Sequence, residues 1–252
     1  MLPGSPKIVI CPNCQKPYLK ETWVSSNTFG ATLWSDGFMQ GPNVPDDRDL
    51  VAQCDSCSTF FIADNAIAER VSKFDFPNQK LPYLKEKVTV EDIVAILGNT
   101  SLMTELEEQH ESKWAKMRKA SPSNPFLKTK DDFKCLLQTN LLFKINDLRR
   151  AGEPVSTSLQ NIFESHAAAV ITQLPEDDEI IIMQKAEWCR NLGRFTETHR
   201  LLKKVHDPEL MKTKYRLKWA AWLRQRKLMK VYSGTKPLPG RIMKWFKNFF
   251  RR

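Results

Sequence analysis

The chain has 252 residues, of which 41% are hydrophobic and 27% charged, and its formal net charge is +10 at neutral pH. This composition is typical of a folded globular protein and argues against a disordered or fibrous one, while the length favours two domains or one domain with an added module. No apolar run approaches the roughly 20 residues of a membrane-spanning helix, and no secretory leader is evident, so we expect a cytoplasmic protein.

Two Cys-x-x-Cys pairs lie near the amino end of the chain. The first is CPNC, with Cys11 and Cys14, and the second is CDSC, with Cys54 and Cys57. In a reducing compartment such pairs bind metal more often than they form disulfides. Each pair presents two thiolates from one tight turn, and two turns complete the tetrahedron that zinc prefers. We therefore predict one structural Zn²⁺ held by these four cysteines, with iron in a rubredoxin-like site as the alternative.

β-Structure is expected around both pairs and between them. β-Branched and apolar residues precede Cys11 (KIVI) and Cys54 (LVAQ), which indicates strands that lead into the two turns. The stretch TFGATLWSDGFMQGP indicates a hairpin with Ser35-Asp36-Gly37 at its turn. We expect four aromatic side chains of this region to cover the metal, namely Trp23, Trp34, Phe60 and Phe61.

Residues 7–62 resemble the zinc-ribbon family, on the evidence of the two cysteine pairs and their preceding strands. The resemblance implies that two neighbouring β-hairpins share one structural zinc. Gln15 and Ser58 stand where that family often has glycine after the second cysteine of each pair. The stretch NTFGATLWSDG also resembles segments of uncharacterised bacterial proteins, and this second resemblance implies no activity.

From about Val88 the pattern becomes helical. Apolar periodicity, capping residues and Gly or Pro stops predict helices at about 89–97, 100–119, 129–150, 157–174, 176–192 and 208–231. Residues 186–205 resemble the helix-turn-helix of a tetratricopeptide repeat, with Gly193 at the turn but Thr198 where the repeat usually has alanine. Two interpretations stay open, a helical hairpin within an all-α bundle and a degenerate repeat array.

The basic charge is concentrated at the carboxy-terminal end, since no acidic residue follows Glu209. In the helix predicted at 208–231, Tyr215, Trp219 and Trp222 share one side, and we expect this aromatic stripe to face the core. Nucleic acid could bind the basic residues of this helix, although a run of charge is usually a solvated face.

A Pro- and Gly-containing linker leads to the final stretch, RIMKWFKNFFRR, which predicts a basic amphipathic helix. Its apolar face must be covered by this protein's own helices, by an anionic membrane surface or by a groove on a partner protein. The residues that would form this binding surface are Trp245, Phe246, Phe249, Phe250, Lys244, Lys247, Arg251 and Arg252.

Taken together, the patterns predict an α+β protein: a β-rich zinc ribbon at residues 1–87, an all-α domain at 88–232 that resembles tetratricopeptide repeats, and a linker with a basic amphipathic helix at 233–252. The sequence contains no nucleophile elbow, phosphate-binding glycine loop or HExxH motif. We therefore expect a non-catalytic interaction or scaffolding protein that binds a protein partner or a membrane surface and no small-molecule substrate. A zinc-ribbon protein that binds nucleic acid through its basic end is the alternative.

Overall fold

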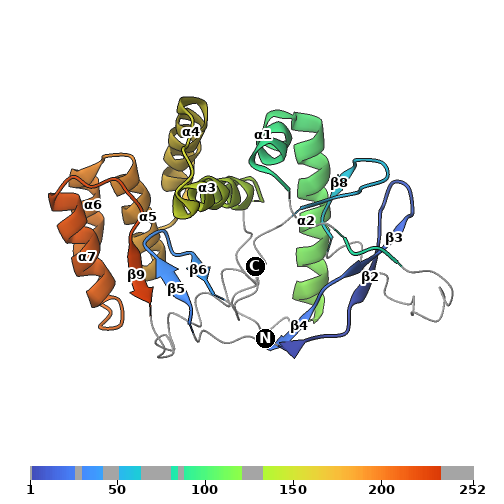
Figure 1. Ribbon diagram of the computed structural model, residues 1–252, viewed down its shortest axis with the longest axis horizontal. Helices are drawn as coiled ribbons and strands as arrows, with labels where there is room; N and C mark the ends of the chain where they lie inside the picture. Colours follow the sequence, from blue (N-terminus) through green and yellow to red (C-terminus); the bar gives the residue numbers. More distant parts are fainter. Residues whose placement is uncertain are drawn as a thin grey trace. The chain divides into compact units, whose positions relative to one another are not determined.

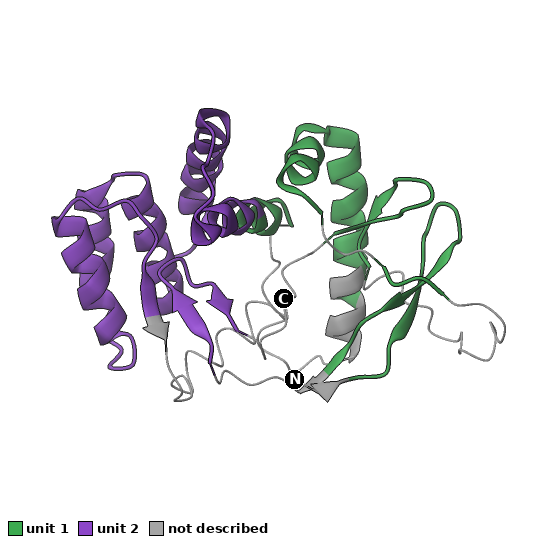
Figure 2. Cartoon of the chain, viewed as in Figure 1, with its two compact units in different colours: residues 1–26, 45–140 green, residues 27–44, 141–252 purple. Residues whose placement is uncertain are grey.

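A computed structural model of the chain describes residues 2–25, 30–41, 51–63, 81–84, 88–120 and 133–233 (Figure 1). The protein has the expected α+β composition, with short strands toward the amino end and seven helices among the described residues. The chain forms two compact units, each made from two separate stretches: residues 1–26 with 45–140, and residues 27–44 with 141–252 (Figure 2). These units divide the chain by compactness, whereas the boundaries at residues 87 and 232 were drawn from composition and stay a prediction.

The strands of the first unit form three antiparallel pairs. β1 (Leu2–Pro3) pairs with β4 (Trp23–Ser25), β2 (Lys7–Ile10) with β3 (Pro17–Lys20), and β7 (Ala52–Gln53) with β8 (Phe60–Phe61). The strands predicted before the two cysteine pairs are β2 and β7, so both predictions are confirmed. Each cysteine pair consequently lies in the turn of its own hairpin, at residues 11–16 and 54–59.

Two helices lie entirely within the first unit, α1 (Val90–Gly98) and α2 (Thr100–Ala120). Thr89 caps α1: its Oγ1 accepts a hydrogen bond from the Asp92 backbone N–H at 3.1 Å, and the Asp92 carboxylate accepts one from the Thr89 backbone N–H at 2.8 Å. This reciprocal pair satisfies two backbone donors that a helix start leaves unpaired. Gln109 of α2 accepts a hydrogen bond from the backbone of Ile62, just after β8.

The second unit contains most of the remaining helices. α3 (Phe133–Ala151) carries the boundary between the units at residues 140 and 141, and α4 (Thr157–Gln173), α5 (Glu179–Asn191), α6 (Phe195–Lys203) and α7 (Met211–Trp222) follow. α6 packs between α5 and α7 (Figure 1). The buried apolar side chains of this unit come from all five helices and include Leu141, Phe163, Trp188, Leu201 and Leu217.

A three-stranded sheet also belongs to the second unit, in the order β6-β5-β9. β5 (Thr32–Trp34) and β6 (Met39–Gln40) form the hairpin predicted around Ser35-Asp36-Gly37, and Gly37 has the positive φ of 90° that this turn requires. β9 (Lys230–Ser233) pairs with β5, although the two strands lie near opposite ends of the sequence. Trp34, which was expected to cover the cysteines, belongs to this hairpin of the second unit and is absent from the hydrophobic core around them.

The helix predicted at 208–231 is also too long. α7 ends at Trp222, where Arg224 takes a left-handed conformation with φ of 54°, and residues 230 and 231 are already in β9. The sequence pattern did not show where the helix ends, because a run of Lys and Arg is compatible with both a helix and an exposed turn. None of the helices in the described residues has both the length and the apolarity needed to cross a membrane.

Candidate metal centre

The two cysteine turns have the same backbone geometry. In the first, the carbonyl of Cys11 accepts a hydrogen bond from the N–H of Gln15 at 3.0 Å, and the N–H of Cys11 donates to the carbonyl of Lys16 at 3.0 Å. In the second, the carbonyl of Cys54 accepts from the N–H of Ser58 at 2.8 Å, and the N–H of Cys54 donates to Thr59 at 3.0 Å. Each turn thereby directs both of its cysteine side chains to one side.

The residue after the second cysteine is left-handed in both turns. Gln15 has φ of 60° and Ser58 has φ of 58°. These are the two positions at which zinc ribbons often have glycine, and a side chain there costs about 1–2 kcal/mol of backbone strain. The turns therefore keep the conformation that glycine would favour, although neither has a glycine.

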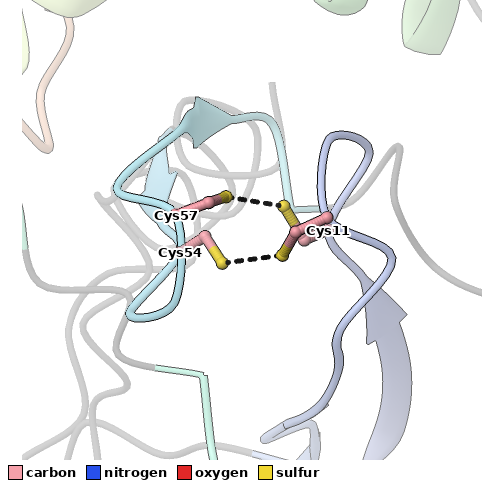
Figure 3. Close-up of side chains that lie close together, drawn as sticks. Cys11, Cys54 and Cys57 are labelled. Carbon is pink, nitrogen blue, oxygen red and sulfur yellow. Dashed lines mark hydrogen bonds between the residues drawn. The ribbon is translucent and has the colours of Figure 1, made fainter.

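The four cysteine sulfurs converge on a single point. All four lie within 4.8 Å of one another, with 3.7 Å between the sulfurs of Cys11 and Cys57 and 3.5 Å between those of Cys14 and Cys54. The sulfurs of Cys11, Cys54 and Cys57 are turned toward one another from the two hairpins (Figure 3). A tetrahedron with metal to sulfur bonds of about 2.3 Å has edges of about 3.8 Å, whereas a disulfide joins sulfurs about 2.05 Å apart. All four cysteines are free, and their spacing fits a metal ion.

The cluster lies at the edge of a small hydrophobic core. Cys11 and Cys54 are completely buried, Cys57 is half-buried, and Cys14 is exposed. Buried side chains around them include Val9, Tyr18 and Phe61, so one of the expected aromatic covers is in place. Of the others, Phe60 is half-buried, and Trp23 is 41% exposed and is absent from that core.

Polar contacts hold the two turns together outside the sulfur cluster. Asn13 donates a hydrogen bond to the Thr59 hydroxyl at 3.0 Å, and Lys16 donates to the Ser56 hydroxyl at 2.6 Å. The Tyr18 hydroxyl lies 3.1 Å from the sulfur of Cys54. Such partners fix the orientation of ligands and tune their affinity for metal.

The four thiols differ in how readily they ionise without metal. Burial raises the pKa of Cys11 to about 12, whereas hydrogen bonds with the side chain and backbone of Thr59 lower the pKa of Cys57 to about 6. A metal ion must therefore displace the proton of Cys11 when it binds, and binding is expected to release protons and to weaken as the pH falls.

The other residues predicted for function have different outcomes. The eight residues of the predicted carboxy-terminal binding surface lie outside the described residues. Cys189 of α5, outside the cysteine cluster, is fully buried, and burial raises the pKa of its thiol to about 11. The prediction for α7 is wrong: Tyr215, Trp219 and Trp222 are 59%, 62% and 66% exposed.

α7 packs by a different face from the one expected. Its buried residues are Leu217, Ala220 and Ala221, which recur at three- and four-residue steps on the side opposite the aromatic stripe. This spacing was the signal in the sequence, but the small alanines carry less apolar surface than the large aromatic rings. The prediction relied on the amount of apolar surface, and it therefore chose the wrong face of the helix as the buried one.

Comparison of the chain with protein-family models, with curated proteins and with solved structures found no match.

Proposed function

We propose that this chain is a non-catalytic binding protein whose first unit is stabilised by a structural Zn²⁺ on Cys11, Cys14, Cys54 and Cys57, in the manner of a zinc ribbon. The observation that carries the proposal is the convergence of four free cysteine sulfurs, from two hairpin turns of equal geometry, within 4.8 Å of one another.

The donor set supports a structural role for the metal and no catalytic one. Four thiolates complete a tetrahedral coordination sphere, whereas catalytic zinc keeps one position open for water or substrate. Because the second hairpin is short, with two residues in each of β7 and β8, it has little hydrogen bonding of its own to hold residues 54–59 in place. A metal that joins the two turns supplies that stability, and free thiols of this kind agree with a cytoplasmic location.

Elemental analysis of the purified full-length chain tests the metal. We expect one zinc ion per chain in the wild type and loss of zinc in Cys54→Ser. Cys135→Ser, a matched control outside the cluster, should keep its zinc. Iron in place of zinc would colour the protein, and the metal would then be iron. Much less than one metal ion per chain in the wild type would overturn the proposal.

The binding role is supported by surface that the protein leaves open. α7 exposes three large aromatic side chains, and the sequence of residues 241–252 predicts a further apolar and basic face. Vesicles that contain anionic lipid test the membrane form of this role. The full chain should sediment with them and a chain that lacks residues 240–252 should not, and equal sedimentation of both would exclude the tail as a membrane anchor.

A further inference from the structure

The exposed face of α7 forms one wall of an open groove. Its cavity volume is about 890 Å³, and its lining combines three aromatic rings of α7 with the cationic side chains of Arg216 and Lys218 from α7 and of Lys230 from β9. Trp219 and Trp222 lie next to each other, with ring centroids 5.1 Å apart. The rings of Tyr215, Trp219 and Trp222 are spread over eight residues of helix, a length of about 10 Å. Exposed aromatic groups gathered in this way mark an interaction surface.

Cationic side chains flank the aromatic rings on both sides. On a helical wheel Lys218 lies on one side of the stripe formed by Tyr215, Trp219 and Trp222, and Lys212 lies on the other. Both lysines are exposed, and within the described residues no carboxylate lies within salt-bridge distance of either. The residues that line the groove include no Asp or Glu, so its charged lining groups are cationic.

The wall of the groove is held in place by the fold. Arg216 donates hydrogen bonds to the carbonyls of Val231 at 2.5 Å and Lys230 at 3.2 Å, which ties α7 to β9. On the other side of the helix, Leu217, Ala220 and Ala221 are buried. The aromatic rings are therefore presented on a helix that packing has already ordered, and the ligand does not have to order it.

Charge and shape together select the ligand. The carboxy-terminal stretch of this chain carries five Lys or Arg and no acid at residues 241–252, so the groove repels it electrostatically. A flat bilayer does not fill a concave surface, whereas a narrow anionic chain with planar groups does. In a duplex the bases are already stacked on one another, but in a single strand they are free to stack on aromatic side chains.

We propose that the α7 groove binds single-stranded nucleic acid, with bases stacked on Trp219, Trp222 and Tyr215 and phosphates contacting Lys212 and Lys218. This inference rests on the proposed function of a non-catalytic binding protein and names the partner. Stacking is tolerant of base identity, so the groove discriminates single strands from duplexes rather than one sequence from another.

Fluorescence anisotropy with a labelled oligothymidylate tests the inference on the full chain. We expect the single strand to bind more tightly than the matching duplex, and the logarithm of its affinity to fall with the logarithm of salt concentration by about 0.7 per phosphate contact. Trp219→Ala should weaken binding roughly tenfold, and Lys218→Gln should reduce the salt dependence. Tyr83→Ala removes a ring that is 54% exposed in the first unit, and Lys7→Gln removes an exposed cation there, so both controls should bind as the wild type does.

Two further variants separate stacking from apolar contact. Trp219→Phe should retain most of the affinity, whereas Trp219→Leu, which keeps apolar bulk without an aromatic ring, should lose it. Equal binding by Trp219→Leu and the wild type would overturn the inference. So would binding of phosphatidylglycerol vesicles through Trp219 in the absence of oligonucleotide binding, which would assign the groove to a lipid surface.

The remaining outcomes are also decisive. Absence of oligonucleotide binding at low salt overturns the inference, and so does binding that appears only when residues 241–252 are deleted, because the groove would then be occupied by the chain's own end. Zinc content is measured in every variant. If the wild type holds one zinc ion but does not bind the oligonucleotide, this inference alone is contradicted. If the wild type holds no zinc, the proposed function is contradicted.

Discussion

Gln15 and Ser58 show how a single backbone torsion positions the candidate metal centre. Each follows the second cysteine of its turn with a positive φ, and this conformation lets its N–H return to the carbonyl of the first cysteine. The side chains at these positions were a weakness in the resemblance to zinc ribbons, since glycine is the residue that adopts this conformation without strain. The structure shows that the conformation is kept and the strain is tolerated.

Relief of that strain should stabilise the first unit. Ser58→Gly is expected to raise the free energy of unfolding by about 1 kcal/mol, because glycine reaches φ of 58° without the steric cost of a Cβ atom. Chemical denaturation of the metal-bound protein measures the change. Asp55→Gly places glycine in the same turn where φ is not positive and should lower stability, and a gain of equal size there would contradict the explanation.

Glu176 is the centre of a surface ion cluster in the second unit. Its carboxylate contacts the ammonium groups of Lys204 at 2.6 Å and Lys185 at 2.9 Å and the guanidinium of Arg200 at 3.1 Å. Hydrogen bonds from Lys204, Lys185 and Arg200 hold the pKa of Glu176 well below its usual range. A carboxylate with a lowered pKa stabilises the folded state above its unfolded pKa, and that stabilisation is lost as the pH falls.

The cluster should therefore give a stability difference that depends on pH. Glu176→Gln is expected to lower the free energy of unfolding by about 1 kcal/mol at pH 7. The difference from the wild type should shrink progressively below the unfolded pKa of about 4.3. Urea denaturation at a series of pH values checks this. Glu153→Gln, an exposed carboxylate outside the cluster, should differ little from the wild type throughout, and a Glu176 difference that persists unchanged at low pH would contradict the assignment.

The helical hairpin of α5 and α6 illustrates how turns fix the order of elements. Gly193 has φ of 76° between the helices, and the hydroxyl of Thr198, fully buried, donates to the carbonyls of Ala186 at 3.2 Å and Arg194 at 3.1 Å. The helix-turn-helix predicted there is present, and its resemblance to a tetratricopeptide repeat stays a prediction. Thr198 occupies the small-residue position because its hydroxyl has two backbone partners.

Two glycines at helix ends allow a matched test of this turn. Gly193→Ala should destabilise the protein by about 1–2 kcal/mol, because alanine is strained at positive φ although a Cβ there would meet only ordinary contacts with Arg226. Gly98→Ala, at the end of α1 with open space around it, should be neutral or stabilising by up to about 1 kcal/mol. Thermal denaturation compares them, and equal effects would show that φ is not the cause.

The second unit is held together by a buried polar network between segments that are far apart in sequence. Ser35, at the β5–β6 turn, donates to the buried carboxylate of Glu187 at 2.5 Å, and Arg190 contacts the same carboxylate at 2.6 Å. The adjacent Asp36 is fully buried and pairs with Arg150 of α3. The turn at Ser35-Asp36-Gly37 thus anchors its hairpin to α3 and α5, which lie more than a hundred residues away in the sequence.

Loss of the Asp36 carboxylate should leave a buried guanidinium without its main partner. Asp36→Ala is expected to destabilise the second unit by about 3–5 kcal/mol, while zinc content in the first unit stays unchanged. Asp147→Ala removes the other carboxylate that pairs with Arg150. Because the Asp147 side chain is 36% exposed, this change should cost less than about 1 kcal/mol. Urea denaturation and metal analysis measure both, and equal losses in the two variants would contradict the role of the buried pair.

Local rules were enough to predict much of this protein. The two Cys-x-x-Cys turns, the strands before them, the capped start of α1 and the turn at Ser35-Asp36-Gly37 follow from chemistry within a few residues. Tertiary structure decided the pairing of β5 with β9, the face on which α7 packs and the unit to which Trp34 belongs. These features depend on contacts between distant segments, and neither periodicity nor composition records which surfaces meet. The exposed aromatic groove of α7 arose in this way, because the burial of Leu217, Ala220 and Ala221 turned the larger side chains outward.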